Sequence, residues 1–410
     1  MYCSAVFWVQ RAVSLINVKC TFWKNFLSSN SKKFSYYREN GGTMYITGLD
    51  TFIDYGSVYL YNFARKNGGV LAFIDIKSVL IVKTIFMHNK VLLSGGVIYG
   101  VKTQNMLLNN GSIFVNNTST DGGGIYLHYI KKLYNIGCKY AQNIATKSGG
   151  AWYLAKADDI RWNTVVASVN CEYLYNEAQG EGGALYIKTA GFLLITGCKF
   201  INNTSLLGSS GAINLQNIQI SIIKINALIG NTARDGASVS SKLCVKMIYR
   251  NNAFIKNEAA RRAAVIFSHR ADVIHILNCS FNNNKQREGA LFITQCVTII
   301  IEKAKFLTNR ADMLAIVYVD TFKKLVSIKN VFVQNKEAGL IEISKGKVYI
   351  DVENSYTKNV GNQGASIHLQ EVPNTLLISS FLSKNSATGR AGAIYAYSCK
   401  VLNILNCTLS

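Results

Sequence analysis

The chain has 410 residues, of which 49% are hydrophobic and 11% aromatic, and it contains only one proline. This composition supports a large core and excludes a disordered or low-complexity chain. The net charge of +22 would attract nucleic acid, anionic lipid or acidic polysaccharide. However, Lys is plentiful together with Asn, Ile and Tyr and its charges are scattered, so a general compositional bias explains the charge equally well. No specific nucleic-acid partner is expected, and the absence of a long apolar run predicts no transmembrane span.

From the N-terminus onward, the chain alternates short runs rich in Ile, Val, Phe, Tyr and Leu with Gly, Asn and Ser, which is typical of strands and turns. Many of these runs follow a Gly-Gly pair or a similar pair of small residues, and this first marker recurs with a period of about 27 residues. The second residue of the pair falls at Ser4, Gly42, Gly69, Gly96, Gly123, Gly150, Gly183, Gly211, Gly236, Ala263, Gly289, Asp312, Gly339, Gly364 and Gly392.

A second marker keeps step with the first. An Asn ends an apolar run in almost every repeat, and an aromatic residue or Leu stands three positions before it, as in Phe200 and Asn203. The Asn marker falls at Asn25, Asn62, Asn89, Asn117, Asn143, Asn176, Asn203, Asn231, Asn257, Asn284, Asn309, Asn335, Asn359 and Asn385. Two markers in step over this many repeats indicate a repeat architecture.

A repeat of this length suits one rung of a parallel β-solenoid, in which each strand pairs with its equivalent in the next rung. We therefore predict an all-β, single-stranded parallel β-helix of about fifteen rungs. The aromatic residues should form an inward column of stacked rings. The asparagines, at positions 89, 117, 143, 176, 203, 231, 257 and 284 among others, should form a structural ladder of amides along the axis. The Gly pair should allow either a positive φ or a close approach of neighbouring rungs.

The markers also carry a resemblance. The motifs GGAL at 182–185 and GAI at 392–394, combined with Phe-x-x-Asn at 200–203 and 254–257, resemble the repeats of polymorphic outer-membrane proteins. More broadly, they resemble the pectin-lyase-like class of right-handed β-helices. The resemblance implies a right-handed helix, an extracellular or cell-surface location and a role in adhesion or recognition. That class also contains polysaccharide lyases and glycosidases, so the resemblance is much weaker for function than for fold.

One outward position in the first strand of the repeat holds an unexpected row of tyrosines. Tyr99, Tyr126, Tyr153 and Tyr186 lie on consecutive rungs, and alternation places them on the outside. We predict an exposed row of rings that could bind carbohydrate or a flat protein surface. The alternatives are that Tyr is simply a favoured strand residue, or that a loop or neighbouring domain covers the row.

Cysteines recur five residues before the Asn marker, in a slot that elsewhere holds Ser or Asn. They are Cys20, Cys138, Cys171, Cys198, Cys279 and Cys407. Axial disulfides such as Cys138–Cys171 or Cys171–Cys198 would fit the rung spacing. The polar substitutions instead favour small, buried free thiols.

Catalytic signals are weak. β-Helix lyases and hydrolases use clustered carboxylates, yet the 22 carboxylates of this chain form no column on neighbouring rungs. The best catalytic candidates are Asp158, Asp159 and Arg161, in the insertion of the longest rung, but they are weak candidates, and a solvated loop explains them better. The five histidines occupy different rung positions, so neither a metal site nor a cofactor is expected.

We expect residues 1–410 to form one β-helix domain with a longer loop near 28–41 and a shorter one near 155–163. Both ends read as mid-rung segments, and the N-terminus lacks the layout of a signal peptide. We therefore expect a fragment without terminal caps, taken from a longer parent protein with further rungs or domains. The expected function is a non-enzymatic scaffold for adhesion to carbohydrate or protein. The alternatives are a polysaccharide lyase or glycosidase, and a basic protein that binds polyanions.

Overall fold

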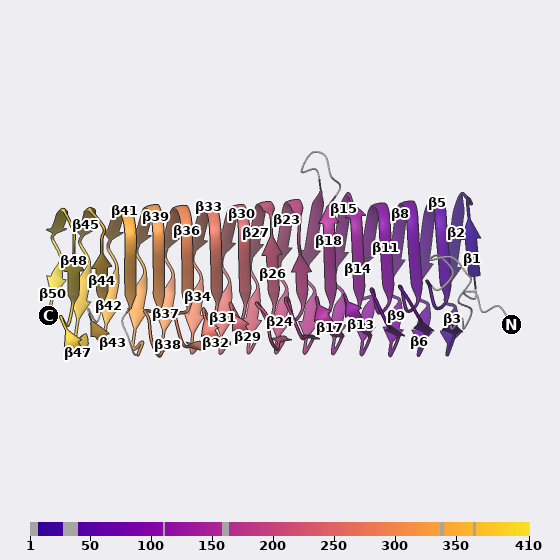
Figure 1. Ribbon diagram of the computed structural model, residues 1–410, viewed down its shortest axis with the longest axis horizontal. Helices are drawn as coiled ribbons and strands as arrows, with labels where there is room; N and C mark the ends of the chain where they lie inside the picture. The colour runs from indigo at the N-terminus through magenta and orange to yellow at the C-terminus, as the bar shows by residue number, and fades with distance from the viewer. Residues whose placement is uncertain (1–6, 28–39, 110, 158–163, 337–339, 364–365) are drawn as a thin grey trace. The chain divides into compact units, whose positions relative to one another are not determined.

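The computed structural model describes residues 7–27, 40–109, 111–157, 164–336, 340–363 and 366–410. The expected loops near 28–41 and 155–163 fall largely outside these ranges. The chain divides into two compact units, Met1–Gln219 and Ile220–Ser410. Each unit is a stack of parallel β-coils, and the described residues contain no helix (Figure 1).

Each coil contributes strands to three sheets, which we call A, B and C in chain order. Sheet A follows the Gly pair, sheet B contains the aromatic marker, and sheet C follows the Asn marker. All pairings between strands are parallel, and equivalent residues of neighbouring coils face each other; in sheet B, for example, Phe114 pairs with Tyr140 and Tyr140 with Tyr173. The predicted parallel β-solenoid with a period of about 27 residues is confirmed.

The strands of sheet A are the longest, because in many coils one strand runs through a kink. In the first unit they are β1 (Phe7–Gln10), β2 (Ser14–Val18), β5 (Met44–Tyr55), β8 (Leu71–Val82), β11 (Ile98–Asn109), β14 (Ile125–Ile130), β15 (Lys132–Ile136), β18 (Trp152–Ala157), β19 (Val165–Val169), β22 (Leu185–Ile187), β23 (Ala190–Thr196) and β26 (Ile213–Gln216); β27 (Ile218–Lys224) contains the boundary. In the second unit they are β30 (Val239–Arg250), β33 (Ile266–Leu277), β36 (Leu291–Glu302), β39 (Val317–Ile328), β41 (Ile341–Val352), β44 (Ile367–Gln370), β45 (Asn374–Ile378), β48 (Ile394–Tyr397) and β49 (Val401–Leu405).

Sheet B has one short strand per coil, with seven of its fifteen strands in the first unit and eight in the second. Those of the first unit are β3 (Thr21–Trp23), β6 (Val58–Leu60), β9 (Ile85–Met87), β12 (Ile113–Val115), β16 (Lys139–Ala141), β20 (Glu172–Leu174) and β24 (Lys199–Ile201). Those of the second unit are β28 (Ala227–Ile229), β31 (Ala253–Ile255), β34 (Ser280–Asn282), β37 (Lys305–Leu307), β40 (Val331–Val333), β42 (Ser355–Thr357), β46 (Phe381–Ser383) and β50 (Thr408–Leu409).

Sheet C closes the coil with the shortest strands. In the first unit these are β4 (Phe26–Leu27), β7 (Phe63–Ala64), β10 (Lys90–Val91), β13 (Thr118–Asp121), β17 (Ile144–Ser148), β21 (Glu177–Ala178) and β25 (Thr204–Ser205). In the second unit they are β29 (Thr232–Asp235), β32 (Glu258–Arg262), β35 (Lys285–Gln286), β38 (Arg310–Ala311), β43 (Val360–Gln363) and β47 (Ser386–Arg390).

The two glycines of the Gly pair have different structural roles. Gly95, the first of its pair, has φ of +69°, in the left-handed region that side chains with a Cβ rarely adopt. A Cβ on Gly96, the second, would lie 1.9 Å from the carbonyl oxygen of Gly123 in the next coil. Both reasons expected for the pair therefore apply, one at each glycine.

The aromatic marker forms the predicted column of stacked rings inside each unit. The centroids of Tyr173 and Phe200 are 4.6 Å apart, and those of Phe281 and Phe306 are 4.5 Å apart, with planes within 6° and 4° of parallel. All four rings are fully buried. One ring therefore stacks in each coil with an aromatic residue at this position, at the spacing set by strand pairing, and Leu228 and Leu382 replace the ring in their coils.

The asparagine ladder is confirmed within each unit, and it uses every polar group of the side chain. The Oδ1 of Asn176 accepts from both the backbone N and the Nδ2 of Asn143, at 3.1 and 3.0 Å. The Nδ2 of Asn176 donates to Oδ1 of Asn203 at 2.9 Å and to the carbonyl of Tyr140, one coil back, at 3.0 Å. The residue before each Asn adopts a positive φ, as at Gln142 and Tyr175, so the ladder satisfies the backbone of a sharp corner.

At three of the stacked tyrosines, Tyr140, Tyr173 and Tyr356, a polar residue five positions earlier binds the hydroxyl group. The hydroxyl of Tyr140 donates to Asn135 Oδ1 at 3.1 Å, and the hydroxyls of Tyr173 and Ser168 are 2.8 Å apart. Tyr356 donates to Asp351 Oδ2 at 2.5 Å. Phe86, Phe200, Phe281 and Phe306 instead have Ile at that position. The choice of ring and the choice of its neighbour are thus matched at these coils, and the three tyrosine hydroxyls have partners. The match is not general, because Phe22, Phe114 and Phe332 follow Asn17, Asn109 and Ser327 at the same spacing.

Replacing a ladder asparagine should destabilise the protein strongly. Asn176→Ala removes both acceptor and donor groups, so the backbone N–H and one of the two Nδ2 N–H groups of Asn143 remain buried without a partner, while the other Nδ2 N–H keeps the carbonyl of Phe114. We expect a loss of roughly 3 kcal/mol or more in the free energy of unfolding, measured by urea titration. Asn105→Ala is the control, because the exposed Asn105 donates only to the carbonyl of Lys77; its effect should stay within about 0.5 kcal/mol. Equal effects of the two variants would contradict a structural role of the ladder.

The matching of tyrosine hydroxyls predicts non-additive substitutions. Tyr173→Phe should cost about 1–2 kcal/mol, because Asn135 and Ser168 both lose a buried partner. Adding Ser168→Ala to Tyr173→Phe should then cost clearly less than Ser168→Ala alone, when the two are compared by urea titration. Simple additivity of the two losses would show that the hydroxyl pair does not stabilise the fold.

Candidate functional site

The predicted tyrosine row exists, and its rings stack on one another. The centroids of Tyr99 and Tyr126 are 5.4 Å apart with planes at 13°, and those of Tyr126 and Tyr153 are 5.1 Å apart at 7°. Tyr186 meets Tyr153 edge to face, at 5.0 Å and 84°. The row lies wholly in the first unit, on β11, β14, β18 and β22.

The prediction that the row is exposed is wrong for two of its members. Tyr153 and Tyr186 are 8% and 5% exposed, and Tyr99 and Tyr126 are half-buried. Alternation does not predict this burial, because neighbouring rings and the side chain of Lys188 pack against Tyr153 and Tyr186. Burial raises the pKa of Tyr153 to about 12 and raises that of Tyr126 still further.

Stacking decides which parts of the rings a ligand could contact. Both faces of Tyr126 are covered by its neighbours in the row, at 5.4 and 5.1 Å. A sugar ring that stacks on an aromatic side chain needs a free face. The row therefore offers ring edges and hydroxyl groups instead, chiefly at the half-buried Tyr99 and Tyr126, because Tyr153 is only 8% exposed.

Charged side chains flank the row at the residue that precedes the Gly pair. This position holds Asp121 in one coil, Ser148 in the next and Glu181 in the one after. Burial raises the pKa of Asp121, although Lys147 and Lys188 oppose the shift, and its Oδ1 has no hydrogen-bond partner among the described residues. Gln216 donates to Glu181 Oε2 at 3.1 Å.

Lys188 adds a cation to the same region. Its Nζ lies 5.5 Å from the ring centroid of Tyr153 and 5.6 Å from that of Tyr186. The row and its flank thus combine hydroxyl, carboxylate, amide and ammonium groups on one surface of the first unit. Asp121, Glu181, Lys188 and Gln216 were missed in the sequence; the constant position before the Gly pair could have identified the two carboxylates.

The same outward position is also aromatic in the second unit. Phe267, Phe292 and Tyr318 stack there, with centroids 5.7 and 4.8 Å apart, and the guanidinium of Arg262 lies 5.6 Å from the Phe267 centroid. These rings were missed because their coils lack a clear Gly-Gly pair. Counting 17 residues back from the Asn marker finds each of them, just as it finds Tyr126 and Tyr186.

The other predicted candidates have different outcomes. Asp158, Asp159 and Arg161 lie outside the described residues. Cys138, Cys171, Cys198 and Cys279 are buried free thiols, as expected, whereas Cys20 and Cys407 are free but only partly buried. Burial raises the pKa of Cys138 to about 12 and that of Cys279 to about 11, so both thiols stay protonated at neutral pH.

Neither a candidate metal site nor a candidate membrane span is found in the described part of the chain. No group of three or more His, Cys, Asp and Glu side chains there could hold a metal ion. Nor is any helix there long and apolar enough to cross a membrane.

No protein-family model, curated protein or solved structure matches the chain. The structure itself shows a parallel β-solenoid. The finer resemblance to polymorphic outer-membrane protein repeats and to the pectin-lyase-like class has no support from a match.

The outward row also contains a carboxylate whose burial predicts a pH effect. Glu342 pairs with Tyr318 of the preceding coil and with His368 of the following coil. Burial raises the pKa of Glu342 above the ordinary value of 4.5. Burial also lowers the pKa of His368, so this neighbour stays neutral to a lower pH than an exposed histidine does. Between pH 4.5 and the raised pKa, the folded state binds more protons than the unfolded state, so stability falls as pH rises through this window.

Glu342→Gln should therefore raise the melting temperature at pH 7, where the wild type has a half-buried charge. The gain should shrink as pH falls and disappear below about pH 4.5, measured by thermal unfolding at a series of pH values. The control is Glu353→Gln, because the carboxylate of Glu353 is exposed, unlike that of Glu342. Its Oε2 lies 3.4 Å from Nζ of Lys329. A gain that is independent of pH would contradict the assignment to the charge of Glu342.

Proposed function

We propose that this chain is a non-enzymatic recognition scaffold that works at a cell surface or after secretion. The tyrosine row with its flanking side chains is the proposed binding surface, and a neutral carbohydrate chain is its preferred ligand. The supporting observation is the line of stacked Tyr99, Tyr126 and Tyr153 beside the polar groups of Glu181 and Gln216. Tyr99 and Tyr126 are its more exposed members. Location and role also draw on the resemblance to polymorphic outer-membrane protein repeats.

Hydroxyl-rich ligands suit this surface for two reasons. Carbohydrate-binding sites contain several hydrogen-bond donors and acceptors close together. Here tyrosine hydroxyls, a carboxylate, an amide and an ammonium group lie together. The groups are also held rigidly by strand pairing and by ring stacking, so that little side-chain entropy is lost on binding. A flat protein partner would use the same edges and is the second class of ligand that the row could accept.

A second candidate function is a polysaccharide lyase or glycosidase. It is favoured by one observation, namely that Asp121 and Glu181 both lie close enough to Tyr153 to affect the pKa of its hydroxyl group. A pair of carboxylates beside a binding row is the arrangement needed for general acid and base catalysis. The two functions differ in their products, because only an enzyme releases new chain ends.

The proposal predicts that removing single row hydroxyls weakens carbohydrate binding. Tyr126→Phe keeps the ring stack but removes one hydroxyl, so affinity for a neutral polysaccharide should fall about threefold to tenfold. Affinity electrophoresis in gels that contain laminarin, xylan or galactomannan would measure the effect. Tyr175→Phe is the control, because Tyr175 is 56% exposed and lies outside the row; it should bind like the wild type.

Two outcomes would contradict the proposal. If none of the three polysaccharides retards the wild type, carbohydrate is not the ligand of the row. If incubation releases new reducing or unsaturated ends and Asp121→Asn abolishes the release, the chain is an enzyme and the second candidate is correct.

A further inference from the structure

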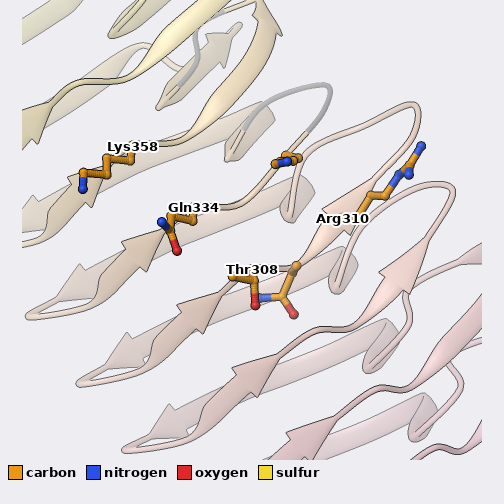
Figure 2. A pocket seen from close by; sticks show the side chains of 6 residues that line it. Thr308, Arg310, Gln334 and Lys358 are labelled. Atoms are coloured by element: carbon orange, nitrogen blue, oxygen red, sulfur yellow. The ribbon is translucent and has the colours of Figure 1, made fainter.

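The second unit contains a groove at the corner between sheets B and C, on top of the asparagine ladder. It has a volume of about 560 Å³ and is lined by Thr308, Asn309, Arg310, Gln334, Lys336 and Lys358 (Figure 2). The lining comes from three successive coils that include β37, β40 and β42. The groove lies entirely within the second unit and is separate from the tyrosine row of the first.

The groove side chains form two registered rows, one on each side of the ladder. Leu307, Val333 and Thr357 pair across neighbouring coils, so the residues that follow them, Thr308, Gln334 and Lys358, form one row. Arg310 and Lys336 pair in the other row, in which Lys285 precedes Arg310. Figure 2 shows Thr308, Gln334 and Lys358 on successive coils, with Arg310 across the corner from them.

Three cations therefore face one another directly in the second row. Lys285, Arg310 and Lys336 occupy neighbouring coils, about 4.8 Å apart by strand spacing. Like charges directly opposite each other destabilise a sheet. Elsewhere the protein places opposite charges at such positions, as in Glu172 with Lys199, whose Oε1 and Nζ are 3.0 Å apart.

The repulsion is only partly relieved within the described residues. Two of the cations form ion pairs: Nζ of Lys285 lies 3.4 Å from Oε1 of Glu258, and Nε of Arg310 lies 2.9 Å from Oδ1 of Asp312. Lys336 and Lys358 are exposed and have no ion-pair partner in the described ranges. An anionic ligand along the corner would neutralise both lysines and offset the cost of placing like charges together.

The floor of the groove makes these cations a rigid template. Asn309 is buried, and its amide donates to Asn335 Oδ1 and to the carbonyl of Phe281, at 3.1 and 2.9 Å. The ladder therefore fixes the separation of the coils, and with it the separation of the charges, before any ligand binds.

We propose that this groove binds a linear acidic polysaccharide, with the chain parallel to the stacking direction. Such a polymer has a carboxylate or sulfate group on each sugar or each second sugar, a regular spacing that a row with one cation per coil can follow. Nucleic acid fits less well, because none of the six lining residues is an aromatic side chain on which bases could stack.

The test is binding of the full chain to dextran sulfate and to polygalacturonate, with neutral dextran and double-stranded DNA for comparison. The double variant K336Q/K358Q should bind the acidic polysaccharides about tenfold more weakly near physiological salt, and wild-type binding should weaken as salt rises. The control is K345Q/K347Q, which removes the same charge from exposed positions in sheet A of the same unit. It should stay within about twofold of the wild type. The sulfated and carboxylated polymers together show which acidic group is preferred.

Several results would overturn the proposal. Equal losses in the two double variants would mean that net charge alone attracts the polymer. Absence of wild-type binding to both acidic polymers would exclude the site, and DNA binding as tight as theirs that is lost in K336Q/K358Q would make the groove a nucleic-acid site. The outcome is independent of the tyrosine row, because Tyr126→Phe should leave binding of the acidic polymers unchanged.

Discussion

The asparagine ladder is the interaction on which the rest of the structure depends. Each coil must turn sharply after sheet B, and the residue at the turn adopts a positive φ, as Tyr175 does. The side chain of the next residue, Asn176, then satisfies backbone and side-chain donors of the coil before it and donates to Asn203 of the coil after it. Because every amide is both donor and acceptor, a shift of one residue in any coil would leave buried polar groups without partners.

The register that the ladder sets extends to the core and to the surface. Inside, it places the rings of sheet B in stacks and lets a polar residue five positions earlier bind the hydroxyls of Tyr140, Tyr173 and Tyr356, as Asn135 does for Tyr140. Outside, the same register converts any residue type that recurs at one position into a line with one side chain per coil. The tyrosine row and the cationic rows of the groove are two such lines, and both proposed binding surfaces follow from this geometry.

Much of the fold could be predicted from the sequence, because turns and stacked rings need particular residue types at fixed spacing. Gly95, Phe200 and Asn203 are visible as markers for that reason. Exposure of the tyrosine row could not be predicted in the same way, because alternation tells which side of a strand Tyr186 occupies but not that Tyr153 and Lys188 pack against its ring. Phe267 and the groove lysines were missed because their rows are defined by register between coils, and the Gly-Gly marker does not define that register in every coil.

The most direct test of the account is the distance between coils in solution. Spin labels on genetically encoded amino acids at Ala253 and Ser355, and at Ala253 and Thr408, would report on sheet B of the second unit, where these residues are four and six coils apart. Stacking in register predicts backbone separations of about 19 and 29 Å, that is, one strand spacing for each coil. Pulsed electron–electron double resonance would measure them. Separations that do not grow in this proportion would show that the coils are not stacked in register, and would contradict the ladder as the organising interaction.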